Sequence, residues 1–256
     1  MTAILRTIHK ASPVLAITGW VHIALLIAML AVAPFDHRLI LGINPWIKPM
    51  KFAISIAIYV WTVAWMLEFL PRPQRLIEWG TASAMIIEMV CIAGQAARGT
   101  TSHFNQSTPF DAAVFGLMGM GIVVSSALAA RLLWLFRAPV AMPPAMLWGV
   151  RLGLALFLVG SADGVAMIVH GAHTVGLADG GPGLPLVNWS TMAGDLRIAH
   201  FLGLHGLQLL PLAGWYFDRQ WPARAVAAVF ALFAGWLAIF AITLAQAAAG
   251  HPLIGA

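Results

Sequence analysis

Charged residues are scarce in this chain of 256 residues. Asp, Glu, Lys and Arg together make up only 9% of it, whereas 61% of its residues are hydrophobic and its mean hydropathy is +0.88. A soluble globular domain carries roughly 25% charged residues, because its surface must face water. The composition therefore excludes an ordinary water-soluble domain.

Cysteine is equally scarce, since Cys91 is the single one. One cysteine excludes an intrachain disulfide, a zinc site built on several thiolates and covalent haem attachment through a C-x-x-C-H motif. Cys91 lies inside an apolar stretch, where a thiol ordinarily serves as a small hydrophobic core residue. The last apolar stretch also has no lysine for a Schiff base, which excludes a retinal protein.

Basic residues outnumber acidic ones, giving a net charge of +5 and a pI of about 10.1. They are spread between the apolar stretches rather than gathered on one face. A nucleic-acid-binding surface needs such a basic patch, so we expect no nucleic-acid partner. Lys and Arg in short connections between apolar stretches instead indicate membrane topology.

Apolar length is what the chain has in abundance. Stretches of ~20 apolar residues are long enough for a helix to cross ~30 Å of hydrocarbon. Breaks rich in Pro, Gly or polar residues separate these stretches. We predict an all-α, polytopic membrane protein with about seven transmembrane helices, forming one domain over residues 1–256 within the lipid bilayer. The predicted spans are Pro13–Ala33, Met50–Leu70, Leu76–Ala97, Phe110–Phe136, Ala145–His170, Asp195–Phe217 and Ala223–Gly250.

The distribution of Lys and Arg predicts the orientation of these spans. More of these residues lie on the N-terminal side of the predicted bundle than on the opposite side. This bias places the N-terminus in the cytoplasm and the C-terminus in the periplasm of a bacterial-type inner membrane. Residues 31–33 read Ala-Val-Ala, like a signal-peptide cleavage site, but the preceding apolar run exceeds the ~7–15 residues of a signal-peptide core. We interpret this run as a retained first helix.

Several ionisable side chains lie well inside the predicted spans, where each costs ~2.5–3.5 kcal/mol at mid-membrane unless it has a partner or a function. Counting ~1.5 Å per residue from the helix ends, His22, Glu88, Asp163 and His205 reach a similar depth from four helices. His200 lies somewhat further out. Buried carboxylates must be paired, protonated or bound to a cation. We therefore predict that Glu88 and Asp163 are catalytic or proton-transferring residues.

A second, shallower layer of polar side chains lies toward the predicted outer face. His170 and His173 share a helix face if the fifth span continues that far. Asp195 and Arg197 are too close in sequence to share a helix face, so we expect each to pair with another group. Gly203, near His205, allows either close helix packing or room for a flat cofactor.

The first functional hypothesis is a membrane redox protein that binds haem b or a related cofactor and transfers electrons, with a quinone or another redox partner. Imidazoles from two helices can supply both axial ligands of a haem. His22 and His205 could form a deep pair of ligands, and His170 or His173 with His200 or His103 a shallower pair. Basic side chains near the surface could bind haem propionates or an anionic substrate. The predicted metal ligands are His22, His103, His170, His173, His200 and His205, and the predicted cofactor-binding residues are Arg98, Arg197 and Gln208.

Two alternatives remain open. A non-haem membrane enzyme would bind Zn or Fe through His and Glu or Asp, although no span carries an H-E-x-x-H motif. A proton-coupled transporter would use the carboxylates and histidines as a relay, although no inverted repeat is evident in the sequence. An enzymatic role as a membrane oxidoreductase is compatible with the first two hypotheses.

Overall fold

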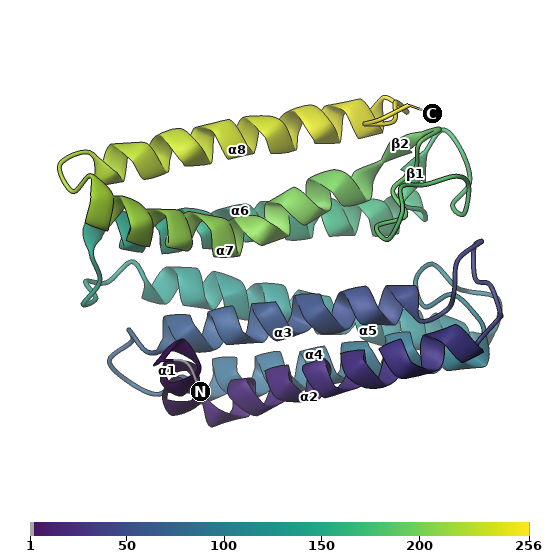
Figure 1. Cartoon of the computed structure of the whole chain (residues 1–256), viewed down its shortest axis with the longest axis horizontal. Coiled ribbons are helices and arrows are strands. Elements are labelled where there is room, and N and C mark those ends of the chain that lie inside the picture. The colour runs from purple at the N-terminus through teal and green to yellow at the C-terminus, as the bar shows by residue number, and fades with distance from the viewer. Residues whose placement is uncertain (1–2, 256) are drawn as a thin grey trace. The chain divides into compact units, whose positions relative to one another are not determined.

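The computed structural model describes residues 3–255 and is predominantly α-helical (Figure 1). It divides into two compact units, unit 1 (Met1–Leu128) and unit 2 (Ala129–Ala256). The boundary falls within one long helix, α5 (Pro109–Leu135). Each unit is a group of packed helices, and each is described by itself below.

Among residues 3–255, six helices are long and apolar enough to cross a membrane, as a multi-pass α-helical membrane protein requires. The predicted sixth span corresponds to α7 (Leu196–Gln220), which is helical but falls short of the hydropathy of the others because it carries several polar side chains. The six membrane-length segments are α2 with the short helix η1 that follows it (Pro13–Phe35), α3 (Ile47–Leu67), α4 (Arg75–Arg98), α5 (Pro109–Leu135), α6 (Pro144–His170) and α8 (Ala225–Ala248).

Unit 1 begins with a short helix that the sequence analysis did not predict, α1 (Ala3–Ala11). Ser12 then caps α2, with Pro13 in its first turn as is common at helix starts. The Ser12 hydroxyl group also donates a hydrogen bond to Glu78 Oε2 of α4 over 3.1 Å. Both side chains are buried, so this bond fixes the start of α2 against α4.

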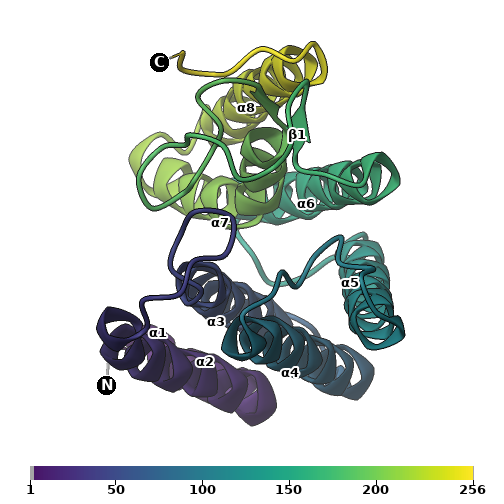
Figure 2. The same ribbon diagram turned by 90° about the vertical axis from the view of Figure 1, so that its right-hand side faces the viewer.

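Helices α2, α3 and α4 pack against one another in unit 1 (Figure 2). The indole of Trp61 in α3 donates a hydrogen bond to the carbonyl oxygen of Ala16 in α2 over 3.2 Å. Gly19 gives this indole its space, since a Cβ there would lie 2.1 Å from Trp61 Nε1. Tyr59 of α3 and Ser125 of α5 share a buried hydrogen bond of 3.0 Å, which connects α5 to the same group.

Unit 2 is built on a close pairing of α6 and α7, with α8 packed against both. Glycines face backbone atoms across this pairing: a Cβ on Gly160 would lie 2.8 Å from Gly203 Cα, and one on Gly149 would lie 2.3 Å from the carbonyl oxygen of Leu210. Small residues allow membrane helices to approach this closely. We call this set of residues the glycine seam. It comprises Gly149, Gly153 and Gly160 of α6 and Gly203, Gly206 and Gly214 of α7.

The glycine seam decides between the two interpretations given to the small residues near His205. Gly203 Cβ would lie 2.5 Å from Gly160 Cα, so these residues serve close helix packing and leave no room for a flat cofactor between α6 and α7. The chain between these helices forms a two-stranded antiparallel sheet, β1 (Thr174–Val175) with β2 (Gly194–Asp195).

Candidate functional site

The connection between α4 and α5, residues 99–108, positions the first candidate site in unit 1. Gly99 ends α4 in a left-handed conformation (φ 78°) that suits glycine. Asn105 then holds the loop through its side-chain amide, which donates to Thr100 Oγ1 over 2.9 Å and to the carbonyl oxygen of Thr101 over 3.1 Å. Phe104 has a positive φ of 57°, a conformation that a bulky residue adopts only when its surroundings impose it.

A buried network of hydrogen bonds around Asp111 holds the loop at both of its ends, through Gln95 and Arg98 of α4 and through Thr108. Asp111 in the first turn of α5 is 3% exposed and accepts hydrogen bonds from Gln95 Nε2 (2.7 Å) and Thr108 Oγ1 (2.6 Å). Arg98 Nη1 forms an ion pair with the same carboxylate at 2.6 Å and also contacts Gln95. The predicted anion-binding residue Arg98 is therefore engaged by a carboxylate of its own chain.

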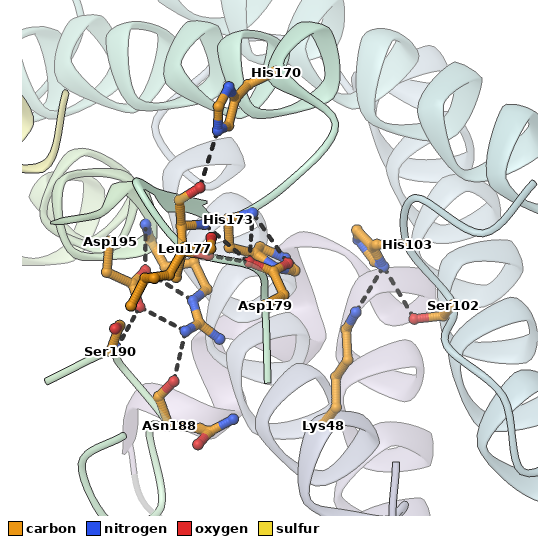
Figure 3. A network of polar contacts seen from close by, with 12 residues as sticks. Lys48, Ser102, His103, His170, His173, Leu177, Asp179, Asn188, Ser190 and Asp195 are labelled. Atoms are coloured by element: carbon orange, nitrogen blue, oxygen red, sulfur yellow. Dashed lines mark hydrogen bonds and ion pairs between the residues drawn. The ribbon is translucent and has the colours of Figure 1, made fainter. Parts of the chain in front are cut away.

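The loop places His103 beside Glu88 of α4. His103 Nε2 lies 4.0 Å from Glu88 Oε1, and His103 Nδ1 lies 3.0 Å from both Lys48 Nζ and Ser102 Oγ. Figure 3 shows the Lys48 and Ser102 side chains directed at the imidazole. Two residues that the sequence analysis selected separately, Glu88 and His103, thus belong to one group. We call Lys48, Glu88 and His103 the Glu88 cluster.

The Glu88 cluster has an apolar wall. The His103 ring lies among Phe52 of α3, Phe104 of the loop and Phe115 of α5, with ring-centroid distances of 5.7, 6.2 and 6.2 Å. Glu88 itself is 2% exposed, and its Oε2 atom has no hydrogen-bond partner among residues 3–255. A carboxylate oxygen in such surroundings is costly to leave charged and unpaired.

Lys48 also settles which nitrogen of His103 carries hydrogen. An ammonium group only donates hydrogen bonds, so Nδ1 accepts from Lys48 and the neutral ring carries its hydrogen on Nε2, facing Glu88. This arrangement places His103 between a cation and a carboxylate. Sequence reasoning did not place Lys48 in this site, because Lys48 lies at the start of α3 and was counted only as a topology signal.

His22 lies in the middle of α2, fully buried. Its Nδ1 donates to the carbonyl oxygen of Thr18, one turn earlier, over 2.7 Å. Its Nε2 is buried and has no hydrogen-bond partner among the residues that the structure describes. The predicted pairing of His22 with His205 joins unit 1 to unit 2 and stays a prediction.

Unit 2 contains the second candidate site, around the α7 histidines. His200 Nδ1 donates to the carbonyl oxygen of Gly160 in α6 over 2.8 Å, and His205 Nδ1 lies 3.3 Å from Gln208 Oε1. The His200 ring lies against Gly164, where a Cβ would be 3.0 Å from its Cε1 atom. Because oxygen acceptors fix the hydrogen on Nδ1, both rings present Nε2 as their lone-pair nitrogen.

His173 belongs to the same site and is held by a carboxylate. Its Nδ1 lies 2.6 Å from Asp179 Oδ2, and Thr174 Oγ1 donates to Asp179 Oδ1 over 2.7 Å (Figure 3). Burial raises the pKa of the Asp179 carboxyl, but the hydrogen bonds from His173 and Thr174 outweigh burial and hold this pKa well below its usual range. His200 interacts electrostatically with both His173 and His205. We call His173, His200 and His205 the histidine cluster.

Two predictions about the outer layer are wrong. Helix α6 ends at His170, because Gly171 adopts a left-handed conformation (φ 76°) that terminates it. His170 and His173 therefore share no helix face, and His170 Nε2 instead bonds the carbonyl oxygen of Thr174 over 2.9 Å. The second wrong prediction concerns Asp195 and Arg197.

Asp195 and Arg197 pair with each other instead of elsewhere. Asp195 is the N-cap of α7 and has extended backbone angles, so the helical spacing used in the prediction does not apply to it. Its carboxylate lies 2.6 Å from Arg197 Nη2, and this guanidinium also donates to the carbonyl oxygen of Asn188 over 2.5 Å. Arg197, like Arg98, is engaged within its own chain.

Asp163 of α6 is 5% exposed, and neither carboxylate oxygen has a hydrogen-bond partner within the described part of the chain. It precedes Gly164, which contacts the His200 ring. Within residues 3–255, no group of three or more His, Cys, Asp or Glu lies close enough to hold a metal ion. Searches of protein-family models, curated proteins and solved structures found no match.

Proposed function

We propose that this chain is a bacterial-type inner-membrane redox protein whose unit 2 binds haem b or a related cofactor and transfers electrons. In this proposal α7 is a seventh span, the N-terminus is cytoplasmic and the C-terminus is periplasmic. The observation that carries the proposal is the shared geometry of the histidine cluster. In each ring Nδ1 faces an oxygen acceptor, from Asp179, the Gly160 backbone or Gln208.

This geometry is typical of metal-binding histidines. A ligating imidazole generally donates its second ring N–H to a carboxylate, a backbone carbonyl or another acceptor, which fixes the tautomer and orients the ligating nitrogen. His173, His200 and His205 have this pattern. A bound haem would supply one-electron chemistry, and His200 or His205 of α7, together with His173 of the α6–α7 connection, would hold it.

The number of protein ligands needed favours haem over a single Zn or Fe ion. A catalytic zinc site takes three protein ligands around one ion, and within residues 3–255 no three His, Cys, Asp or Glu side chains lie close enough together to hold a metal ion. A haem needs only one or two axial ligands. The glycine seam is filled by helix packing, so a haem would lie outside it. Asp163, buried in the same unit, would exchange the proton that accompanies electron transfer from a quinol or a similar partner.

The absorption spectrum of the purified full-length protein tests this proposal. We expect a Soret band that shifts on reduction with dithionite and is lost in the His200→Ala and His205→Ala variants. The His9→Ala variant, which changes a histidine of α1, should keep the band. Stoichiometric zinc or iron without haem would instead support the non-haem alternative, and a protein that purifies with neither would support proton-coupled transport.

A further inference from the structure

The Glu88 cluster joins an aqueous end of unit 1 to a carboxylate inside a membrane-length helix. Glu88 lies ten residues before Arg98, the last residue of α4, which corresponds to ~15 Å along the helix axis. The His103 side chain is 21% exposed, whereas the Glu88 side chain is 3% exposed. The imidazole is thus the group through which solvent approaches the buried carboxylate.

The geometry points to a proton-transfer site in which His103 relays protons between solvent and Glu88. This function is independent of the redox cofactor proposed for unit 2. It accounts for a buried carboxylate with an unpartnered oxygen, an imidazole whose Nε2–H faces that carboxylate and a cation on the other ring nitrogen.

The transfer moves one proton from solvent to Glu88. Lys48 Nζ and Ser102 Oγ move away from His103 Nδ1, a hydronium ion gives its proton to Nδ1 and leaves as water, and the Nε2 proton passes to Glu88 Oε1. His103 becomes neutral again, now with hydrogen on Nδ1, and Glu88 becomes a carboxylic acid. The Nε2–Oε1 distance of 4.0 Å exceeds a hydrogen bond by ~1 Å, which a small side-chain movement or one bridging water closes.

Lys48 controls when His103 can accept a proton. The charged and titratable groups that interact with Glu88 are Lys48 from α3, His103 from the loop and Cys91 from α4. Lys48 supplies the positive charge that balances an ionised Glu88. It also opposes protonation of His103, because both cations would then share one small space. Each proton therefore reaches Glu88 only when Lys48 withdraws.

Aromatic side chains pack against the imidazole of the relay. The rings of Phe52, Phe104 and Phe115 lie 5.7, 6.2 and 6.2 Å from the His103 ring, centroid to centroid. Apolar side chains thus pack against the imidazole beside its polar neighbours Lys48, Ser102 and Glu88. The fastened loop holds this position, because Asn105 and Asp111 bond its two halves. The imidazole is held in place while its protons exchange.

Time-resolved infrared spectroscopy of the full-length protein in liposomes tests the relay. After a rapid drop in pH, the carbonyl stretch of protonated carboxylic acids should appear, and the Glu88→Gln variant should lack the part of this signal that belongs to Glu88. The His103→Phe variant keeps the aromatic packing but removes both ring nitrogens, and we expect the band to form at least tenfold more slowly.

Added imidazole separates a relay from a structural role. In the His103→Ala variant, imidazole in the buffer should restore the rate of Glu88 protonation, while the His9→Ala variant should behave as the original protein with or without it. The proposal is overturned if Glu88→Gln keeps the full band, or if both His103 variants protonate at the original rate. The readout involves no haem, so its failure is distinguishable from failure of the redox proposal.

Discussion

His200 of α7 donates a hydrogen bond from Nδ1 to the backbone carbonyl of Gly160 in α6, 2.8 Å away. Gly160 is also the residue whose missing Cβ lets the Gly203 backbone approach. The orientation of the imidazole and the packing of the two helices thus depend on one residue. A change in the glycine seam should therefore affect both stability and the histidine cluster.

Replacing Gly160 with Leu should destabilise unit 2. The new side chain would meet Gly203 backbone atoms within 2.9 Å, and overpacking of this kind costs ~1–3 kcal/mol or more. Thermal unfolding in detergent should show a clearly lower Tm than for the original protein. The matched control is Gly116→Leu, because a Cβ at Gly116 meets nothing within 4 Å. Equal losses in the two variants would contradict the seam.

Removing the cap of α7 should also destabilise the protein. Asp195 is fully buried, accepts from Arg197 N at the helix start and pairs with the Arg197 guanidinium. The Asp195→Ala variant loses the cap, worth ~1 kcal/mol, and leaves a partly buried cation without its carboxylate, which adds to the loss. The Asp195→Asn variant keeps the cap, and its free energy of unfolding in denaturant should lie between those of the original protein and the Asp195→Ala variant. An Asn variant as unstable as the Ala variant would show that the cap contributes nothing.

The loop that carries His103 should depend on Asp111. The Asp111→Asn variant removes the charge that pairs with Arg98 and weakens the bonds to Gln95 and Thr108. Breaking a buried ion pair costs ~3–5 kcal/mol, and partial exposure of Arg98 reduces this figure. We expect faster proteolysis within residues 99–108. The Gln106→Ala variant, which alters an exposed residue of the same loop, should be cleaved as slowly as the original protein.

Acid stability should depend on Asp179. The pKa of this carboxyl is held below its unfolded value of ~3.9, so its contribution to stability is present above pH ~4 and is lost as the pH falls below that value. The original protein should therefore lose Tm between pH 5 and pH 3. The Asp179→Asn variant should start from a lower Tm at pH 5 and lose less over the same range.

A matched control isolates this effect, because other carboxylates also contribute. A hydrogen bond from Arg38 likewise holds the pKa of Asp36 well below its usual range, so part of the acid sensitivity should persist in the Asp179 variant. The Glu68→Gln variant, at an exposed position, should follow the original curve. A parallel curve for Asp179→Asn, shifted but with the same slope, would refute the prediction.

Most of the helical architecture could be predicted from the sequence, because the length of each apolar stretch can be read directly from the order of its residues. Six of the seven predicted spans correspond to membrane-length apolar helices. The helix α1 was missed because its nine residues are too few for a span. The end of α6 depends on a left-handed Gly171, a conformation that no periodicity reveals, and so the predicted His170–His173 face was wrong.

The candidate sites were only partly predictable. Depth along each helix selected Glu88, but depth says nothing about rotation or about neighbouring loops. The contact between Glu88 and His103 depends on the fold of residues 99–108, which in turn depends on Asn105 and on the positive φ of Phe104. Lys48 joins the cluster through the start of α3, and a sequence-based depth estimate places it at a surface rather than beside a buried acid.

The glycine seam has a consequence for the descent of this protein. Its members lie at positions 149, 153 and 160 in one helix and at positions 203, 206 and 214 in the other. Lipid-facing side chains can drift among apolar types without harm, whereas a position that meets backbone atoms tolerates only the smallest residues. Spaced glycines across two helices should therefore persist after overall identity has faded, and they offer a pattern by which remote kin of this chain can be recognised.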